Sequence, residues 1–340
     1  MKKVSILLLL LTSLFPTSAE EGLTIVAVGD AEVEKDKIAV VAASVPSNAD
    51  AGMQKAINEV QGLLQNDFAF YKNAFEVVKS SGFESDCVSR NYSKLKARNL
   101  RYCIVTSFEK KSANEFGMEA RLYDTRAEKE IENIRVTIPV NNPRENAHEA
   151  ADVLYQKIFG KASIFRSKII FVSDYPSRGT GEIKELYIMD FDGKNRKQLT
   201  HHRGTVISPA FSFDGKKVLY SLIKNQRTKN RNVNLRLLEI DTGKDTLLSS
   251  RAGINSGAVF MPDGQHIALT MSHEGNAEIY KLNVATKKTE RITKHFAPDV
   301  DPSINVSGTK MAFLSGRSGQ GSPMIYIADP RELEKSVKTI

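Results

Sequence analysis

Ser208-Pro-Ala-Phe-Ser-Phe-Asp-Gly215, followed by Lys216-Lys-Val-Leu-Tyr-Ser221, decides the fold, because the pattern returns twice further along the chain. The later copies open with Gly257-Ala-Val-Phe-Met-Pro-Asp-Gly264 and Asp301-Pro-Ser-Ile-Asn-Val-Ser-Gly308. The turns of the three copies are 49 and 44 residues apart, and the segments that end each unit keep the same spacing. Strand-like repeats with a period in the forties are typical of a β-propeller, in which each unit forms one four-stranded blade.

The repeat units also predict how much of a propeller is present. In the second unit we expect strands over 210–213, 217–222, 234–239 and 245–249, with Asp-Gly turns between them. The first unit, from Lys168, has no inner strand ahead of it, and the fourth unit ends with the chain. Because open sheet edges are a liability, we expect a C-terminally truncated chain with four of six blades, about 100 residues short of a ring. A complete four-bladed ring is the alternative.

The N-terminus has the pattern of a cleavable secretory signal over residues 1–19. Two lysines precede an apolar run over 4–11, and small residues occupy 17–19. The apolar run is too short to span a bilayer as a helix, and position 20 is Glu rather than a lipid-accepting Cys. We therefore expect a soluble exported protein that begins near Glu20; a buried helix is the alternative interpretation of the apolar run.

Residues 20–160 do not repeat and mix helical with strand patterns. A helix is predicted over 53–64, and another from Pro143 through Ile158, with Gly160 as its stop signal. The fold class is therefore an α/β N-terminal domain over 20–160, followed by an all-β propeller over 161–340. The strands expected in the N-terminal domain are 23–28, 38–43, 102–108, 118–123 and 134–140.

Charge and cysteine content narrow the possible functions. The net charge is +8, and removal of the signal leaves +6. The only dense basic run, 224–231, coincides with the longest repeat and is expected to be a loop, so nucleic acid is excluded as a partner. Cys87 and Cys103 can form a disulfide in an oxidising compartment or remain free thiols, and their spacing does not decide between the two.

No catalytic or cofactor motif stands out in the sequence. Gly316-Arg-Ser-Gly-Gln-Gly321 lacks the second glycine of a nucleophile elbow, and His201-His202 has no carboxylate or cysteine at metal-ligand spacing. Asp299 and Asp301 are too few to define a Ca²⁺ site. We therefore expect a binding protein without a cofactor rather than an enzyme.

The connections between blades are the predicted binding face. In a propeller, the segments from the outer strand of one blade to the inner strand of the next gather around the channel mouth, and here they are 201–207, 251–256 and 294–300. Functional residues concentrate on loops held by a rigid scaffold. The predicted partner-binding residues are His201, His202, Arg203, Arg251, Asn255, His295, Asp299 and Asp301.

The sequence resembles the TolB family of periplasmic propeller proteins in three respects. These are the repeat with its hairpin over 186–200, the join Ile158-Phe-Gly-Lys-Ala-Ser-Ile-Phe-Arg-Ser-Lys-Ile169, and the order of signal, α/β domain and propeller. The resemblance implies a non-enzymatic scaffold of the Tol–Pal system, which supports outer-membrane integrity and envelope constriction during cell division. It implies binding of a peptidoglycan-associated lipoprotein (Pal) at the channel mouth. It also implies contact of the segment 20–30 with TolA, through Glu20, Glu21, Leu23, Ile25 and Val26.

Two other functional classes remain open from the sequence. One is a propeller that gates a serine peptidase whose catalytic part lies beyond residue 340, and the signal and α/β domain argue against it. The other is a propeller enzyme acting on a sugar or metabolite. It would need charged residues converging on the channel, whereas the inner strands are mostly small and apolar.

Overall fold

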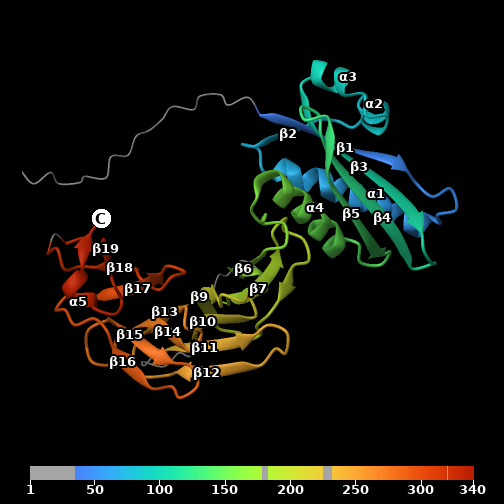
Figure 1. Cartoon of the computed structure of the whole chain (residues 1–340). Coiled ribbons are helices and arrows are strands. Elements are labelled where there is room, and N and C mark those ends of the chain that lie inside the picture. The colour runs from blue at the N-terminus through green and yellow to red at the C-terminus, as the bar shows by residue number, and fades with distance from the viewer. Residues whose placement is uncertain (1–34, 178–182, 225–231, 320) are drawn as a thin grey trace, which may run out of the picture.

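A computed structural model describes residues 35–177, 183–224, 232–319 and 321–340. An α/β unit is followed by four β-sheets that form an open arc (Figure 1). The predicted strand 23–28 and the basic run 225–231 lie outside the described residues. Within the described part of the chain, no helix combines the length and the apolar character needed to cross a membrane.

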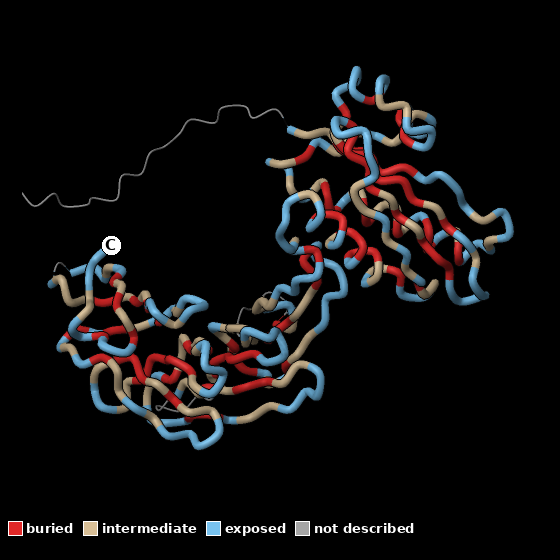
Figure 2. The backbone as a smooth tube through the Cα atoms, viewed as in Figure 1, coloured by how far each residue is buried: buried red, intermediate tan, exposed pale blue. Residues whose placement is uncertain are grey.

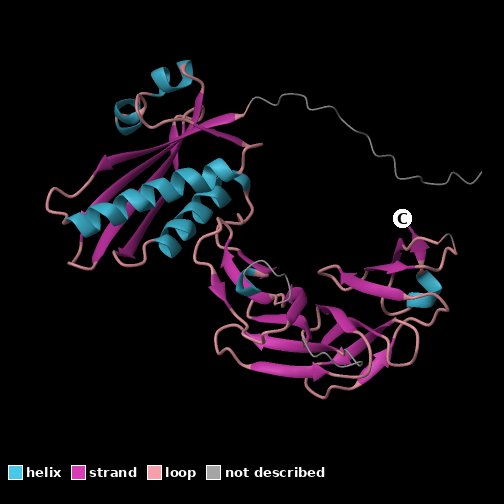
Figure 3. Ribbon diagram, turned by 180° about the vertical axis from the view of Figure 1, so that it is seen from behind, coloured by secondary structure: helices cyan, strands magenta, loops and turns pink. Residues whose placement is uncertain are grey.

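The α/β unit is a five-stranded sheet with two long helices on one face (Figure 3). The strand order is β2-β1-β3-β4-β5, in which β1 pairs in parallel with β2 and β3 and the remaining pairs are antiparallel. The Asp50 carboxylate caps α1 by accepting from Met53 N at 2.9 Å, and Gly160 ends α4 with a φ of 69°. The elements are β1 Asp36–Ser44, α1 Ala51–Phe70, β2 Phe75–Val77, β3 Leu100–Lys110, β4 Glu115–Asp124, β5 Lys129–Pro139 and α4 Arg144–Phe159.

The two faces of this sheet bury different cores. Ile38, Val40 and Ile104 pack under α1 and α4 in the larger core, and their neighbours in the strands point the other way. The second face is covered in part by two short helices, α2 Glu84–Val88 and α3 Tyr92–Ala97. Side chains are therefore buried on both faces of the sheet. Figure 2 shows buried residues along its strands and along the two long helices.

A disulfide between Cys87 and Cys103 ties α2 to the central strand β3. Both cysteines are buried among Val41, Leu95 and Tyr123. Helices of five and six residues are too short to be stable by themselves, so α2 and α3 depend on this packing and on the covalent tie. The question that the sequence left open is thus answered in favour of a bonded pair.

The propeller consists of one three-stranded and three four-stranded antiparallel sheets. Along the chain, the blades are β6 to β8, β9 to β12, β13 to β16, and β17 to β20. The last three run from the inner to the outer strand, whereas β6 and β7 match the second and third strands β14 and β15, so the first sheet lacks a counterpart of the inner strand among the described residues. The first two sheets are β6 Lys168–Ser173, β7 Glu185–Asp190, β8 Lys197–Gln198, β9 Thr205–Phe211, β10 Lys217–Ile223, β11 Val233–Glu239 and β12 Asp245–Ser249. The last two are β13 Asn255–Phe260, β14 His266–Met271, β15 Glu278–Asn283, β16 Thr289–Arg291, β17 Asp299–Ile304, β18 Met311–Ser315, β19 Met324–Ala328 and β20 Lys338–Thr339, with the short helix α5 Leu333–Ser336 before β20.

Each complete inner strand carries a bulge at the same repeat position. Ser208, Gly257 and Asp301 have φ values of 50°, 61° and 53°, and the pairing register of each strand shifts there. A Cβ added at Gly257 would lie 2.6 Å from the Asp301 Oδ1 atom of the next blade. The bulges of neighbouring blades therefore touch, and position 257 has no room for a side chain.

The turn after β7 joins the propeller to the α/β unit. Phe191 is buried in the larger core of that unit, with ring centroids 5.6 Å from Phe70, 5.7 Å from Phe165 and 5.3 Å from His148. The next residue, Asp192, forms an ion pair with Arg144 of α4. The first blade is thus anchored by an inserted aromatic ring and a flanking salt bridge.

Reduction of the disulfide is expected to destabilise the α/β unit by about 3 kcal/mol, since the bond closes a loop of 16 residues in the unfolded chain. Urea unfolding with and without reductant measures the difference. The double variant Cys87→Ser/Cys103→Ser is the control, because its unfolding should not respond to reductant. A wild-type transition unaffected by reductant would contradict the expectation.

Candidate partner-docking face

The connectors between blades lie together at one end of the propeller. Neighbouring strands in each blade are antiparallel. The connectors therefore lie at the same end of the propeller as the loops between the second and third strands of each blade. These connectors are 200–204, 250–254 and 292–298. We call this end the mouth face. The Phe191 turn, by the same rule, lies at the opposite end. The α/β unit is therefore anchored at the end of the first blade opposite its mouth-face loops.

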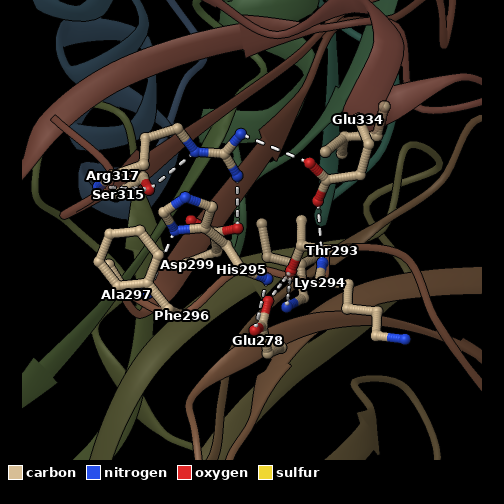
Figure 4. A network of polar contacts seen from close by, with 12 residues as sticks. Glu278, Thr293, Lys294, His295, Phe296, Ala297, Asp299, Ser315, Arg317 and Glu334 are labelled. Carbon is tan, nitrogen blue, oxygen red and sulfur yellow. Dashed lines mark hydrogen bonds and ion pairs between the residues drawn. The ribbon is translucent and has the colours of Figure 1, made fainter.

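The connector between the third and fourth blades is held by hydrogen bonds with buried Glu278, half-buried Asn276 and exposed Glu334 (Figure 4). Glu278 is fully buried at the start of β15, and its carboxylate accepts from Thr293 Oγ1 at 2.6 Å and from His295 N at 3.0 Å. The Glu334 carboxylate accepts from Lys294 N at 2.8 Å, and Asn276 Nδ2 donates to the His295 carbonyl at 2.9 Å. The backbone of this connector is thus fixed at several successive residues.

On this fixed backbone, the Phe296 side chain is 81% exposed. Its ring lies 4.3 Å from the His295 ring, and His295 Nδ1 accepts from Ala297 N at 3.1 Å. A large aromatic side chain on a pre-organised loop is typical of the residues that dominate binding energy in protein interfaces. The structure thus presents an anchor residue that the sequence analysis did not single out.

The connector between the first and second blades is also held by a buried carboxylate. Glu185, buried at the start of β7, accepts from Thr200 Oγ1 at 2.5 Å and from Arg203 N at 2.7 Å. Arg203 has a φ of 54° and an exposed side chain. Glu185 and Glu278 occupy the same repeat position, since they pair with the equivalent residues Ser173 and Met271.

The second blade differs, because Asn234 stands at the repeat position where the first and third blades have Glu185 and Glu278. The Asn234 Oδ1 atom is buried without a partner among the described residues. Asn255, fully buried at the start of the next blade, holds this connector instead. Its side chain accepts from Ser249 Oγ at 2.7 Å and donates to the carbonyls of Arg251 at 2.8 Å and Val233 at 2.9 Å.

Asp299 occupies in the fourth blade the position of Asn255 in the third. It is fully buried; Oδ2 accepts from Arg317 Nη2 at 2.6 Å, and Oδ1 has no partner among the described residues. Burial raises the pKa of the Asp299 carboxyl, against the opposing effect of Arg317. The Arg317 guanidinium lies over the rings of Phe313 and Tyr326, which places this cation as internal support.

His202 faces inward, into a polar network of the second blade. Its Nε2 lies 2.7 Å from Tyr220 Oη, and Tyr220 Oη and Arg236 Nε donate to the Asp245 carboxylate at 2.7 Å and 2.9 Å. Although burial opposes ionisation of Asp245, hydrogen bonds from His202, Arg236 and Tyr220 lower the pKa of Asp245 to about 2. Burial also raises the pKa of Tyr220.

The predicted docking residues therefore fall into two groups. His201, Arg203, Arg251 and Asp301 are exposed, and His202 and His295 are half-buried. Asn255 and Asp299 are fully buried, so they act on a partner only through the loops that they hold. The predicted N-terminal contact residues, Glu20, Glu21, Leu23, Ile25 and Val26, lie outside the described residues.

Three further exposed residues on this face were missed by the sequence analysis. Lys294, Ile254 and Tyr175 are exposed, the last by 73%. Lys294, Arg203 and Arg251 have no carboxylate partner within the part of the chain that the structure describes. Apolar and cationic side chains thus alternate on the mouth face.

Atoms suited to a metal come together only at the opposite end, among the described residues. His148, Asp190 and Asp192 place ligand atoms within 4.8 Å of one another. Arg144 already pairs with Asp192, and Lys168 Nζ lies 2.6 Å from Asp190. Because these cations occupy the carboxylates, we assign the cluster to the anchoring of the first blade.

These features define a class: a propeller that presents rigid, largely polar loops at one end and carries an α/β unit at the other. The family model of the TolB beta propeller domain matches residues 155–336, and the chain belongs to this family. That assignment agrees with the resemblance drawn from the repeat motif.

Curated relatives and a solved structure support the assignment. The Tol-Pal system protein TolB of Rickettsia akari is 29% identical over 243 residues, covering 70% of this chain and 52% of that protein. The protein of the same name from Francisella tularensis subsp. mediasiatica is 31% identical, covering 67% and 52%. The crystal structure of TolB from Acinetobacter baumannii covers 90% of this chain and 71% of that chain, with 26% identity and a TM-score of 0.73. The chain thus spans about half the length of the curated relatives it matches.

The network around Asp245 predicts a specific acid sensitivity. The pKa of Asp245 falls from 3.8 to about 2 on folding, so its stabilising contribution is complete above about pH 4 and lost as the pH falls through 2. Asp245→Asn should cost on the order of 1–2 kcal/mol of unfolding free energy at pH 7 and little near pH 2. Thermal unfolding across this range measures the difference, with Asp241→Asn on an exposed turn as the control. A cost of Asp245→Asn independent of pH would contradict the assignment.

Proposed function

We propose that this protein is a non-enzymatic docking component of a Tol–Pal envelope system in the periplasm, with a Pal-like peptidoglycan-associated lipoprotein bound at the mouth face. The observation that carries the proposal is Phe296, an exposed aromatic ring on a connector whose backbone is held by Glu278, Asn276 and Glu334. The names of the TolB relatives and the secretory pattern of residues 1–19 support it.

The chemistry of the face describes the partner. Phe296 and Ile254 require apolar pockets, and the cations Arg203, Arg251 and Lys294, which have no carboxylate partner among the described residues, favour acidic groups around those pockets. Because the connectors are already ordered by buried Glu and Asn side chains, little loop entropy is lost on binding. The lipoprotein would then be held by a few aromatic and aliphatic contacts within a steering field of positive charge.

The N-terminal segment supplies the second half of the proposal. Residues 20–30 precede β1 and are proposed to contact a TolA-like inner-membrane protein, through the five residues named above. A protein that binds an outer-membrane lipoprotein at one site and an inner-membrane protein at another connects the two membranes. Outer-membrane integrity and constriction at division are the processes that such a connection serves.

Phe296→Ala is expected to weaken lipoprotein binding by at least about tenfold, because the anchor ring loses its pocket. Isothermal titration with the purified lipoprotein of the same organism measures the change. Val45→Ala removes an exposed apolar side chain from the α/β unit and should leave the affinity unchanged. Equal affinities for wild type and Phe296→Ala would show that Phe296 does not anchor the lipoprotein and would contradict the proposal.

Deletion of residues 20–30 separates the two proposed contacts. The shortened protein should lose crosslinking to TolA in intact envelopes while still binding the lipoprotein. Mass spectrometry of the crosslinked, immunoprecipitated protein reads out both partners in one sample. Undiminished recovery of TolA with the shortened protein would show that the contact lies elsewhere.

A further inference from the structure

The end of the propeller opposite the mouth face has its own surface pattern. It consists of the turns between first and second strands and between third and fourth strands of each blade, and we call it the hairpin end. The first-to-second turns are 212–216, 261–265 and 305–310. The α/β unit contacts this end only through the 190–192 turn of the first blade, among the contacts of the described residues. The turns of the later blades are exposed.

Apolar residues project from the tips of these turns. Phe213, Pro262 and Val306 occupy the same repeat position, immediately before the Asp-Gly or Ser-Gly pair. Phe213 is 54% and Val306 80% exposed, although apolar side chains of this size are usually buried. A Cβ on Gly308 would lie 3.2 Å from Pro262 Cγ, so the tips of the third and fourth blades touch. The tips of the third and fourth blades are therefore continuous, and Phe213 lies at the same repeat position of the second blade; we call these three tips the rim.

Lysines surround this rim. Lys216 and Lys217 follow the Phe213 tip, and Lys310 follows the Val306 tip. All three are exposed and have no carboxylate partner among the described residues. The third-to-fourth turns add further exposed cations: Lys194, Lys197, Lys244, Lys287, Lys288, Arg331 and Lys335.

The carboxylates of the hairpin end offset part of this charge, although several are held by hydrogen bonds within their own turns. Asp214 accepts from Ser212 Oγ and Lys216 N within its own turn, and Asp263 from Gln265 N and His266. Glu239 pairs with Lys244 at 3.3 Å, and Asp192 pairs with Arg144 of the α/β unit. The remaining exposed carboxylates of these turns, among the described residues, are Asp241, Glu290, Glu332 and Glu334. Cations outnumber carboxylates across the rim.

We propose that the hairpin end docks on the headgroups of an anionic phospholipid bilayer. Projecting apolar tips suit a lipid surface, which accepts them at the headgroup level without shaped pockets, and a ring of lysines is attracted by its negative potential. Each lysine near such a surface strengthens the attraction, which weakens with salt. The mouth face would then point away from the bilayer, so lipid docking leaves the proposed partner site open.

Vesicle co-sedimentation tests the charge component. The full chain is mixed with vesicles of equal parts phosphatidylcholine and phosphatidylglycerol, or of phosphatidylcholine alone. It should pellet with the mixed vesicles at low salt and be released in half-molar salt. Lys216→Gln/Lys217→Gln/Lys310→Gln should lower the partition coefficient at least about tenfold. The matched variant Arg203→Gln/Arg251→Gln/Lys294→Gln, on the mouth face, should retain wild-type partitioning.

Fluorescence tests the apolar component, because the chain contains no tryptophan. The emission of Phe213→Trp should shift to the blue on addition of mixed vesicles, whereas Val45→Trp on the α/β unit should not respond. Thermal unfolding confirms that both variants are folded.

Three results would overturn the proposal: no co-sedimentation with mixed vesicles at low salt, an equal loss with the mouth-face variant, or binding to peptidoglycan sacculi instead of vesicles. Lipoprotein binding measured on the same hairpin-end variants keeps this proposal separate from the proposed function. The two depend on opposite ends of the propeller.

Discussion

The propeller end that presents the connectors depends on buried carboxylates whose hydrogen-bonding capacity is filled by the backbone that they hold. An ionised group inside a protein is costly unless it is paired and hydrogen-bonded. Glu278 meets this requirement with Thr293, Arg291 and the His295 amide, and Glu185 does so with Thr200 and the Arg203 amide. Movement of either connector would take backbone donors away from a buried carboxylate. The buried Glu side chains at the start of the third strands therefore keep these connectors rigid.

The junction with the α/β unit is also fixed by a buried side chain, here an aromatic one. Phe191 belongs by sequence to a propeller turn and by packing to the core of the other unit. Next to it, Asp67 and His148 form a buried pair at 2.8 Å, and burial raises the pKa of Asp67. A hinge movement at this point would expose the ring and disturb the buried pair, so the first blade and the α/β unit are expected to move together.

The sequence carries the large features of this fold because they are periodic. The spacing of apolar residues predicts α1 and α4, and the repeats predict the blades, since both patterns follow from helix and strand geometry. The helices α2 and α3 were not predicted, because their stability comes from packing against β3 and from the disulfide rather than from local pattern. Phe296 was not singled out for a related reason: its exposure depends on a backbone fixed by Glu278 and Glu334, which are distant in sequence. His202 was expected at the surface, and its inward turn depends on Tyr220 and Asp245, which local pattern does not reveal.

The contact between the inner-strand bulges of the third and fourth blades limits which substitutions the protein accepts at these positions. Position 257 accommodates only glycine while Asp301 stands beside it, whereas the equivalent positions 208 and 301 carry side chains at similar positive φ values. Substitutions at 257 and 301 are therefore not independent. A larger residue at 257 becomes acceptable only after 301 has become small, so these two positions on neighbouring blades must change in that order.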